Sequence, residues 1–103
     1  MKTLVALVGM KHRGTEEIVK ALPQGEPLTL VREPGNPHDP NAIQVWAQGH
    51  HVGYVKATQA RALAMAMDRA ALAMPGGAAR PAYAKPAKLA IDGGKWPMVE
   101  IDE

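Results

Sequence analysis

The segment REPGNPHDPNAIQV, residues 32–45, constrains the fold of this chain more than any other stretch. It holds three prolines, one glycine, two asparagines, one aspartate and one histidine, and it leads directly into an apolar run. Because a proline disfavours helical backbone in the residue before it, Asn36 and Asp39 are both directed away from a helix. Their short side chains can bond nearby backbone amides and build successive turns, as Asn41 can before the next strand. The segment is therefore predicted to be a bend that separates two strands.

Short apolar segments on both sides of this bend predict β-strands. Glycine, proline or polar residues separate them, and their lengths are typical of strands rather than helices. The QGH at 48–50 predicts a tight hairpin. The expected strands are 3–9, 27–33, 42–47, 51–55, 88–92 and 98–102.

Two segments have helical character. Thr15 is expected to cap a short helix that ends near residue 22, before Pro23. Over 58–74, apolar residues that include Leu63 and Met67 recur at helical spacing, which predicts one long helix. The fold class that follows is mainly β with helices (α+β): a small, partly open antiparallel barrel of five or six strands. The long helix follows the fourth strand.

The length and composition limit the class of protein. With 103 residues, the chain is expected to form a single domain over 1–103. It has no cysteine, so a disulfide framework and a thiolate metal site are excluded. The apolar stretch Leu4–Met10 is at the short limit for a signal peptide and no cleavage site follows it, so we interpret it as a strand. We expect a cytoplasmic protein with no membrane contact.

Basic residues are concentrated in the middle of the chain. Residues 40–90 contain six lysines and arginines but only one acid, Asp68, whereas the last four residues, EIDE, are acidic. A second basic cluster, KHR, lies at 11–13. Such segregation can attract a polyanion to one surface, although ordinary solvated charges would give the same composition.

The order VALVGMKHRG, then LTLVREPGNPHDPNAIQVW, then GHHVGYVKATQARALA resembles the HIRAN domain. The specific part is REP, then NP, an aromatic or similar residue, D, any residue and NAI, followed later by VGY and a nearby lysine. The resemblance is close over residues 3–67 and looser beyond. It implies a barrel related to the OB-fold, in agreement with the strand pattern. Stand-alone members of this family are found in bacteria and phages.

The resemblance also implies a function. It indicates a non-catalytic module without a cofactor that binds single-stranded DNA and recognises its free 3′-hydroxyl end. HIRAN domains are also found fused to Swi/Snf-type helicases and nuclease-like domains, so the implied partners are DNA ends and a helicase or nuclease in DNA repair. Carried over position by position, the implied nucleic-acid-binding residues are Lys11, His12, Asn36, His38, Asp39, Tyr54 and Lys56.

The chemistry of these residues is consistent with the implied roles. An ionised Asp39 only accepts hydrogen bonds, so it suits a terminal hydroxyl and repels an internal phosphate. Lys11 and Lys56 would hold the preceding phosphates. His12 and His38 replace larger rings of the family pattern, which leaves less area for stacking on a base.

Several of these residues have a purely structural alternative. Asn36 and Asp39 can serve the turn alone, and Tyr54 can be a core residue instead of a stacking platform. Trp46 is expected to pack under the long helix, and Arg32 to pair with Glu33. Positive charges outside the motif, on Lys85 and Lys88, are expected to be solvated.

Two other functions remain open. A metal-dependent nuclease could use His12, His38 and Asp39, or His50 and His51, although adjacent strand residues point to opposite faces. A protein-interaction or regulatory domain without a functional DNA pocket could instead use an exposed strand edge.

Overall fold

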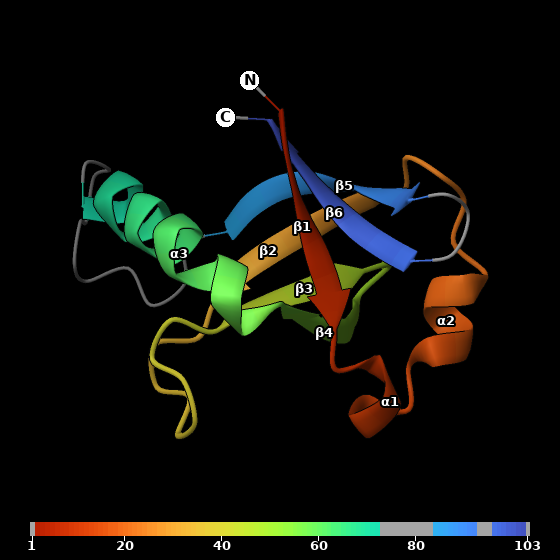
Figure 1. The fold of residues 1–103 in the computed structure, drawn as a ribbon, viewed down its shortest axis with the longest axis horizontal. Helices are drawn as coiled ribbons and strands as arrows, with labels where there is room; N and C mark the ends of the chain where they lie inside the picture. Colours follow the sequence, from red (N-terminus) through yellow and green to blue (C-terminus); the bar gives the residue numbers. More distant parts are fainter. Residues whose placement is uncertain (1, 73–83, 93–95, 103) are drawn as a thin grey trace.

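The computed structural model describes residues 2–72, 84–92 and 96–102. These residues form six strands and three helices (Figure 1). In chain order they are β1 (Lys2–Val8), α1 (Met10–Arg13), α2 (Glu16–Lys20), β2 (Pro27–Arg32), β3 (Ile43–Ala47), β4 (His50–Val55), α3 (Ala57–Leu72), β5 (Ala84–Asp92) and β6 (Trp96–Asp102).

The six strands form a closed antiparallel barrel in the order β1-β4-β3-β2-β5-β6. The prediction of a small antiparallel barrel with a long helix after the fourth strand is confirmed, but the barrel is closed rather than partly open. Closure depends on β1, which pairs with β6 over its first five residues and with β4 through Leu7 and Val8. β1 therefore closes the barrel by pairing with β4 on one side and with β6 on the other.

Alternating strand residues fill the barrel and form one core. β3 shows the pattern, because Ile43, Val45 and Ala47 are buried while the residues between them are half-exposed. Each large side chain buried in this way contributes about 1.5–3 kcal/mol. α3 packs Ala60, Leu63, Ala64 and Met67 into the same core. The predicted helical face is therefore confirmed for Leu63 and Met67, and the expected residues 73 and 74 lie outside the described part.

The segment between β1 and β2 differs from the prediction. A four-residue helix, α1, was not expected; it lies between Gly9 and Gly14, which both adopt positive φ angles of 84° and 69°. Thr15 does not cap α2 through its side chain. Its hydroxyl donates a hydrogen bond to the Val52 carbonyl of β4 instead.

The same segment covers an edge of β4. Because β4 pairs with β1 only at its end, the carbonyls of His51 and Val52 need other donors. Arg13 Nε donates to the His51 carbonyl at 3.0 Å and the Thr15 hydroxyl to Val52. Side chains therefore block the stretch of β4 at which another strand could pair.

A β-bulge on β4 determines which side chains reach the outer face. The hairpin turn has consecutive positive φ angles at Gln48 and Gly49, 51° and 80°, as the predicted tight turn requires. Past it, Trp46 is opposite His51 but Val45 is opposite Gly53, so one residue of β4 is extra. Residues three apart would normally face opposite ways, but the bulge places His51 and Tyr54 on one face.

Candidate nucleic-acid interface

The bend between β2 and β3, residues 33–42, is held by its own polar side chains. Asn36 Oδ1 accepts hydrogen bonds from the backbone amides of His38 and Asp39, at 2.8 and 3.0 Å. Asp39 Oδ1 accepts one from the Asn41 amide at 2.8 Å. The structural alternative is therefore present for both residues: Asn36 uses both of its polar side-chain atoms within the protein, since Nδ2 donates to Glu33, whereas Asp39 uses only Oδ1. Asn41 contributes its backbone amide to this network.

Asp39 keeps one carboxylate oxygen outside this network. The residue is half-buried, and within the described part of the chain Oδ2 has no hydrogen-bond donor. The bonded oxygen is held by the Asn41 amide, and Arg32 bonds the carbonyls of Pro40 and Ala42 on either side of Asn41. The second oxygen thus belongs to a carboxylate that is held at one end and keeps an acceptor outside the network.

Glu33 joins the bend to the barrel, a role that the sequence did not reveal. Its Oε1 accepts hydrogen bonds from Tyr54 Oη at 2.9 Å and from Gln44 Nε2, and its Oε2 accepts one from Asn36 Nδ2 at 2.5 Å. Hydrogen bonds, that from Gln44 above all, hold the pKa of Glu33 below its ordinary value despite partial burial.

The expected pair between Arg32 and Glu33 is wrong. Arg32 is the last residue of β2 and its side chain is buried against Asp68 of α3, whereas Glu33 follows the strand. Arg32 Nε and Nη2 bond the Asp68 carboxylate at 2.8 and 3.2 Å. Its guanidinium also donates to the carbonyls of Ala42 and Pro40, at 2.8 and 3.0 Å. Arg32 therefore anchors the second half of the bend to α3.

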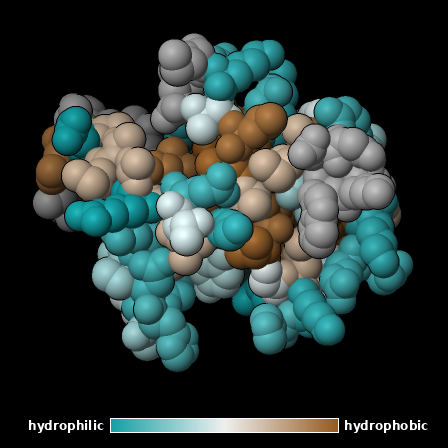
Figure 2. Space-filling view, in the orientation of Figure 1, coloured by the Kyte–Doolittle hydropathy of each residue, from teal (hydrophilic) through white to brown (hydrophobic). Residues whose placement is uncertain are grey.

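Lys11 and Lys56 line one pocket of about 530 Å³. Its wall is the end of β1, and Glu16 and Met98 of neighbouring elements also line it. Figure 2 shows hydrophobic surface over this end of β1, next to the hydrophilic surface of α1. Two lysines far apart in sequence are thus brought to one largely apolar hollow, which Glu16 also lines.

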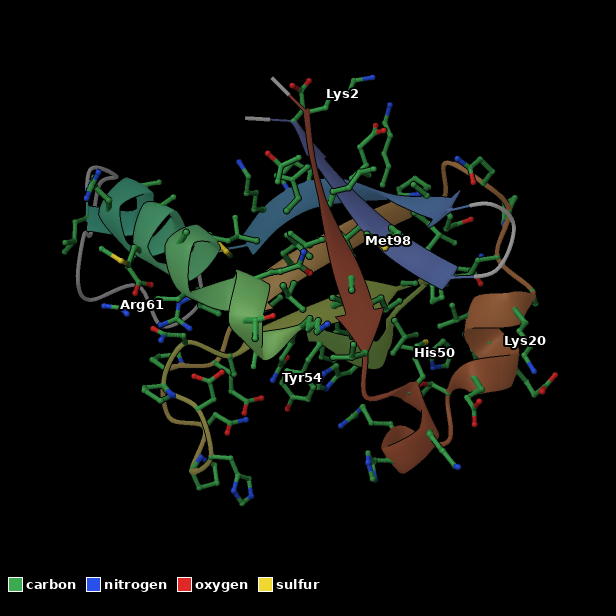
Figure 3. All side chains as sticks on the ribbon, in the orientation of Figure 1. Lys2, Lys20, His50, Tyr54, Arg61 and Met98 are labelled. Atoms are coloured by element: carbon green, nitrogen blue, oxygen red, sulfur yellow. The ribbon has the colours of Figure 1, made fainter. Side chains whose placement is uncertain are left out.

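Gly9 connects this pocket to the bend. It lines the pocket, and a side chain placed on it would come within 3.7 Å of Cδ2 of Tyr54. Tyr54 in turn bonds Glu33 at the base of the bend. In Figures 1 and 3 the bend, Tyr54 and α1 all lie on the lower side of the barrel. Contacts therefore lead from Asp39 through Asn36 and Glu33 to Tyr54, which lies beside the Gly9 wall of the pocket.

Tyr54 and Trp46 lie on the outer face, in contrast to the structural alternatives. Val52 is fully buried, whereas Tyr54 is half-exposed because the bulge changes the alternation. Trp46 does not pack under α3; it is stacked on His51, with ring centroids 5.5 Å apart and planes 15° apart. The predictions that Tyr54 could join the core and that Trp46 lies under the helix are wrong.

The pattern around this surface matches a known family. Residues 2–87 match the family model described as HIRAN domain, which is most of the chain. The chain belongs to the HIRAN family. The resemblance found from the sequence is confirmed, and this family is that of a DNA-binding module.

Two known proteins are similar to this chain. The Helicase-like transcription factor of Oryctolagus cuniculus is 52% identical over 44 residues. Those residues are 42% of this chain but 4% of that protein, so this HIRAN domain corresponds to a small part of its relative. The crystal structure of the HIRAN domain of human HLTF is 27% identical, with a TM-score of 0.48 over 100% of this chain and 76% of that one.

The two histidines that replace family aromatics are exposed in this HIRAN domain. His12 lies on α1 and His38 at the tip of the bend, and within the described residues neither side chain has a hydrogen-bond partner. No group of three or more metal-ligating side chains occurs among the described residues. His50 and His51 are separated in environment, since His50 is exposed and His51 is half-buried between two rings.

The described helices include none that could cross a membrane. Lys85 and Lys88 were expected to be solvated charges. They line a separate hollow together with Lys2 and Glu100. Lys2 lies 3.8 Å from Glu100. This hollow is on β5 and β6 and shares no residue with the pocket of Lys11 and Lys56.

Proposed function

We propose that this HIRAN domain binds the 3′-hydroxyl end of single-stranded DNA and has no catalytic activity of its own. The terminal sugar lies against Asp39, whose free oxygen accepts a hydrogen bond from the 3′-hydroxyl. The preceding phosphates lie at Lys11 and Lys56. A strand that continued beyond the sugar would bring a phosphodiester beside the carboxylate and be repelled.

The observation that carries the proposal is a chain of contacts in which Asn36 holds Asp39, Glu33 joins Asn36 to Tyr54, and Tyr54 lies beside Gly9 of the pocket of the two lysines. An acceptor that suits a hydroxyl and two cations that suit phosphates lie at its opposite ends. The polar contacts within the bend lower the entropic cost of holding the acceptor in place. A helicase or nuclease that delivers or uses such ends is the partner that this function would need.

The competing functions have less support. Pairing of a partner strand requires a free edge, and in the described strands the exposed stretch of β4 is blocked by Arg13 and Thr15. A metal nuclease requires clustered ligands, and the described His12 and His38 lie on separate exposed segments. Binding of a DNA end is the function that uses the whole surface.

The test is binding of a labelled single-stranded oligonucleotide, followed by fluorescence anisotropy over a range of salt concentrations. The logarithm of the affinity should fall with that of the salt concentration, with a slope of about −0.7 for each phosphate engaged. Lys11→Glu and Lys56→Glu should each lower the affinity and reduce this slope.

The matched control is Lys88→Glu, which makes the same charge change at the separate hollow on β5. It should retain most of the binding. Equal losses in all three variants would show that only overall charge matters, and absence of binding by the unmodified protein at low salt would contradict the proposal.

A further inference from the structure

Three aromatic rings form a continuous row on the outer face of β3 and β4. Trp46 stacks on His51, as described above, and the edge of Tyr54 meets the His51 ring at a centroid distance of 4.9 Å and an angle of 74°. The resemblance assigned a role only to Tyr54. Trp46 and His51 belong to no assigned site, and they reach this face because of the bulge on β4.

The row is fixed in place by polar contacts. The Trp46 indole N–H donates to Gln44 Oε1 at 2.8 Å, and Gln44 in turn donates to Glu33. His51 Nε2 lies 3.0 Å from the Gly53 carbonyl. Rings held in this way lose little conformational freedom when a ligand stacks on them, which favours binding.

On the side of β2, the residue paired with Trp46 is small. His51 covers the face on the side of β4, while the cross-strand neighbour on β2 is Thr29, a small and exposed residue. Beyond it, Pro86 of β5 is opposite Thr29 and also exposed. No large described side chain of β2 or β5 is paired at this position to cover the indole, so a flat ligand can stack there.

A fixed positive charge lies at the other side of the row. Arg13 donates through Nε to the His51 carbonyl at 3.0 Å, which leaves its remaining N–H groups for a further acceptor. Its guanidinium is close enough to lower the pKa of His51, whose burial is the larger cause of that lowering. Since a lowered pKa favours the neutral imidazole near pH 7, the row carries its positive charge at Arg13 and not in its centre.

We propose that Trp46, His51 and Tyr54, with Arg13 beside them, form a second stacking subsite for nucleobases of single-stranded DNA upstream of the terminal nucleotide. Aromatic rings on a sheet with a flanking cation are the combination that binds single strands without sequence preference. The subsite supplies the ring area that His12 and His38 do not. This inference rests on the proposed function, because Tyr54 is shared between the two parts of the surface.

The test compares a long and a short oligonucleotide, both ending in a 3′-hydroxyl. Trp46→Leu keeps apolar bulk but removes the π face, and it should weaken binding of an octanucleotide about tenfold, as the loss of one stacked base does. Binding of a dinucleotide should be unchanged, because it occupies only the end site. Trp46→Phe, which restores a ring, should recover much of the octanucleotide affinity.

A second measurement does not depend on these variants folding equally well. In a Trp96→Phe background Trp46 is the sole tryptophan, and its fluorescence should be quenched by the octanucleotide but not by the dinucleotide. Equal effects of Trp46→Leu on both lengths, or no quenching by bound octanucleotide, would overturn the subsite.

The outcomes also separate the two proposals. If the octanucleotide shows the Trp46 effect but a 3′-hydroxyl and a 3′-phosphate bind equally well, the end-recognition function fails and the stacking subsite stands. If the hydroxyl preference is present and Trp46 has no effect, the end site stands and the stacking subsite fails. If the unmodified protein binds no oligonucleotide, both are overturned.

Discussion

The hydroxyl of Tyr54 donates a hydrogen bond to Glu33 Oε1 at 2.9 Å, and this contact joins the bend to the barrel. Through Glu33 it reaches Asn36, whose side-chain oxygen in turn holds the amides of the bend. The geometry of the candidate end site therefore depends on a carboxylate that the ligand need not touch.

The hydrogen bond between Tyr54 and Glu33 should couple the two residues in stability. Tyr54→Phe should lower the free energy of unfolding by about 1 kcal/mol, the net value of one such hydrogen bond, and Glu33→Ala should lower it more, because it removes the acceptor of three. Because the two residues share one hydrogen bond, the double variant should lose less than the sum of the single variants. Urea unfolding of all four proteins measures this, and strictly additive losses would show that the contact does not form in solution.

Arg32 and Asp68 should contribute unequally to stability although they form a salt bridge. Asp68→Asn should cost less than about 1 kcal/mol, because the Asp68 side chain is 55% exposed. Arg32→Lys should cost about 2 kcal/mol, because the carbonyls of Ala42 and Pro40 lose their donors as well. Urea unfolding of the two variants measures this difference. Similar decreases in the free energy of unfolding would contradict the anchoring of the bend by Arg32.

Stability should depend on pH through His51. Burial, helped by the charge of Arg13, lowers its pKa in the folded chain below the ordinary value of 6.5, while the Gly53 carbonyl and Glu33 oppose the shift only in part. The unfolded chain therefore takes up the proton first as the pH falls. The contribution to stability is complete above 6.5, declines below it and is lost by the time the pH has fallen through the folded pKa.

Urea unfolding at a series of pH values between about 7.5 and 5 would detect this decline. His51→Gln should make the profile flatter in this range. His50→Gln, a change at the exposed neighbour in the same hairpin, is the control and should leave the profile as it is. A profile unaffected by either change would contradict the shift at His51.

Patterns that are local in sequence predicted most of the fold. The bend, the hairpin at Gln48 and Gly49 and the buried face of α3 all follow from neighbouring residues. α1 was missed because its four residues are too few to show helical spacing, and it is marked only by the flanking Gly9 and Gly14. Closure of the barrel was missed because it depends on long-range pairing of β1, which reaches β4 through Leu7 and Val8 beyond the residues that pair with β6.

The residues of the candidate site were named from the sequence and stay a prediction, while the contacts between them come from the structure. Lys11 and Lys56 line one pocket. From the sequence, Glu33 was expected to pair with Arg32, and His51 was a candidate metal ligand. Their observed contacts arise instead from the tertiary structure and, for His51, from the bulge that changes the direction of residues on β4.

Asp39→Asn is the variant that tests whether Asp39 recognises a 3′-hydroxyl. This change keeps an oxygen for the Asn41 amide, removes the charge and leaves Lys11 and Lys56 in place. The unmodified protein should bind an oligonucleotide with a 3′-hydroxyl more tightly than the same strand with a 3′-phosphate. Asp39→Asn should abolish that preference while salt-dependent binding persists. Equal binding of the two strands by the unmodified protein, or an unchanged preference in Asp39→Asn, would contradict the account.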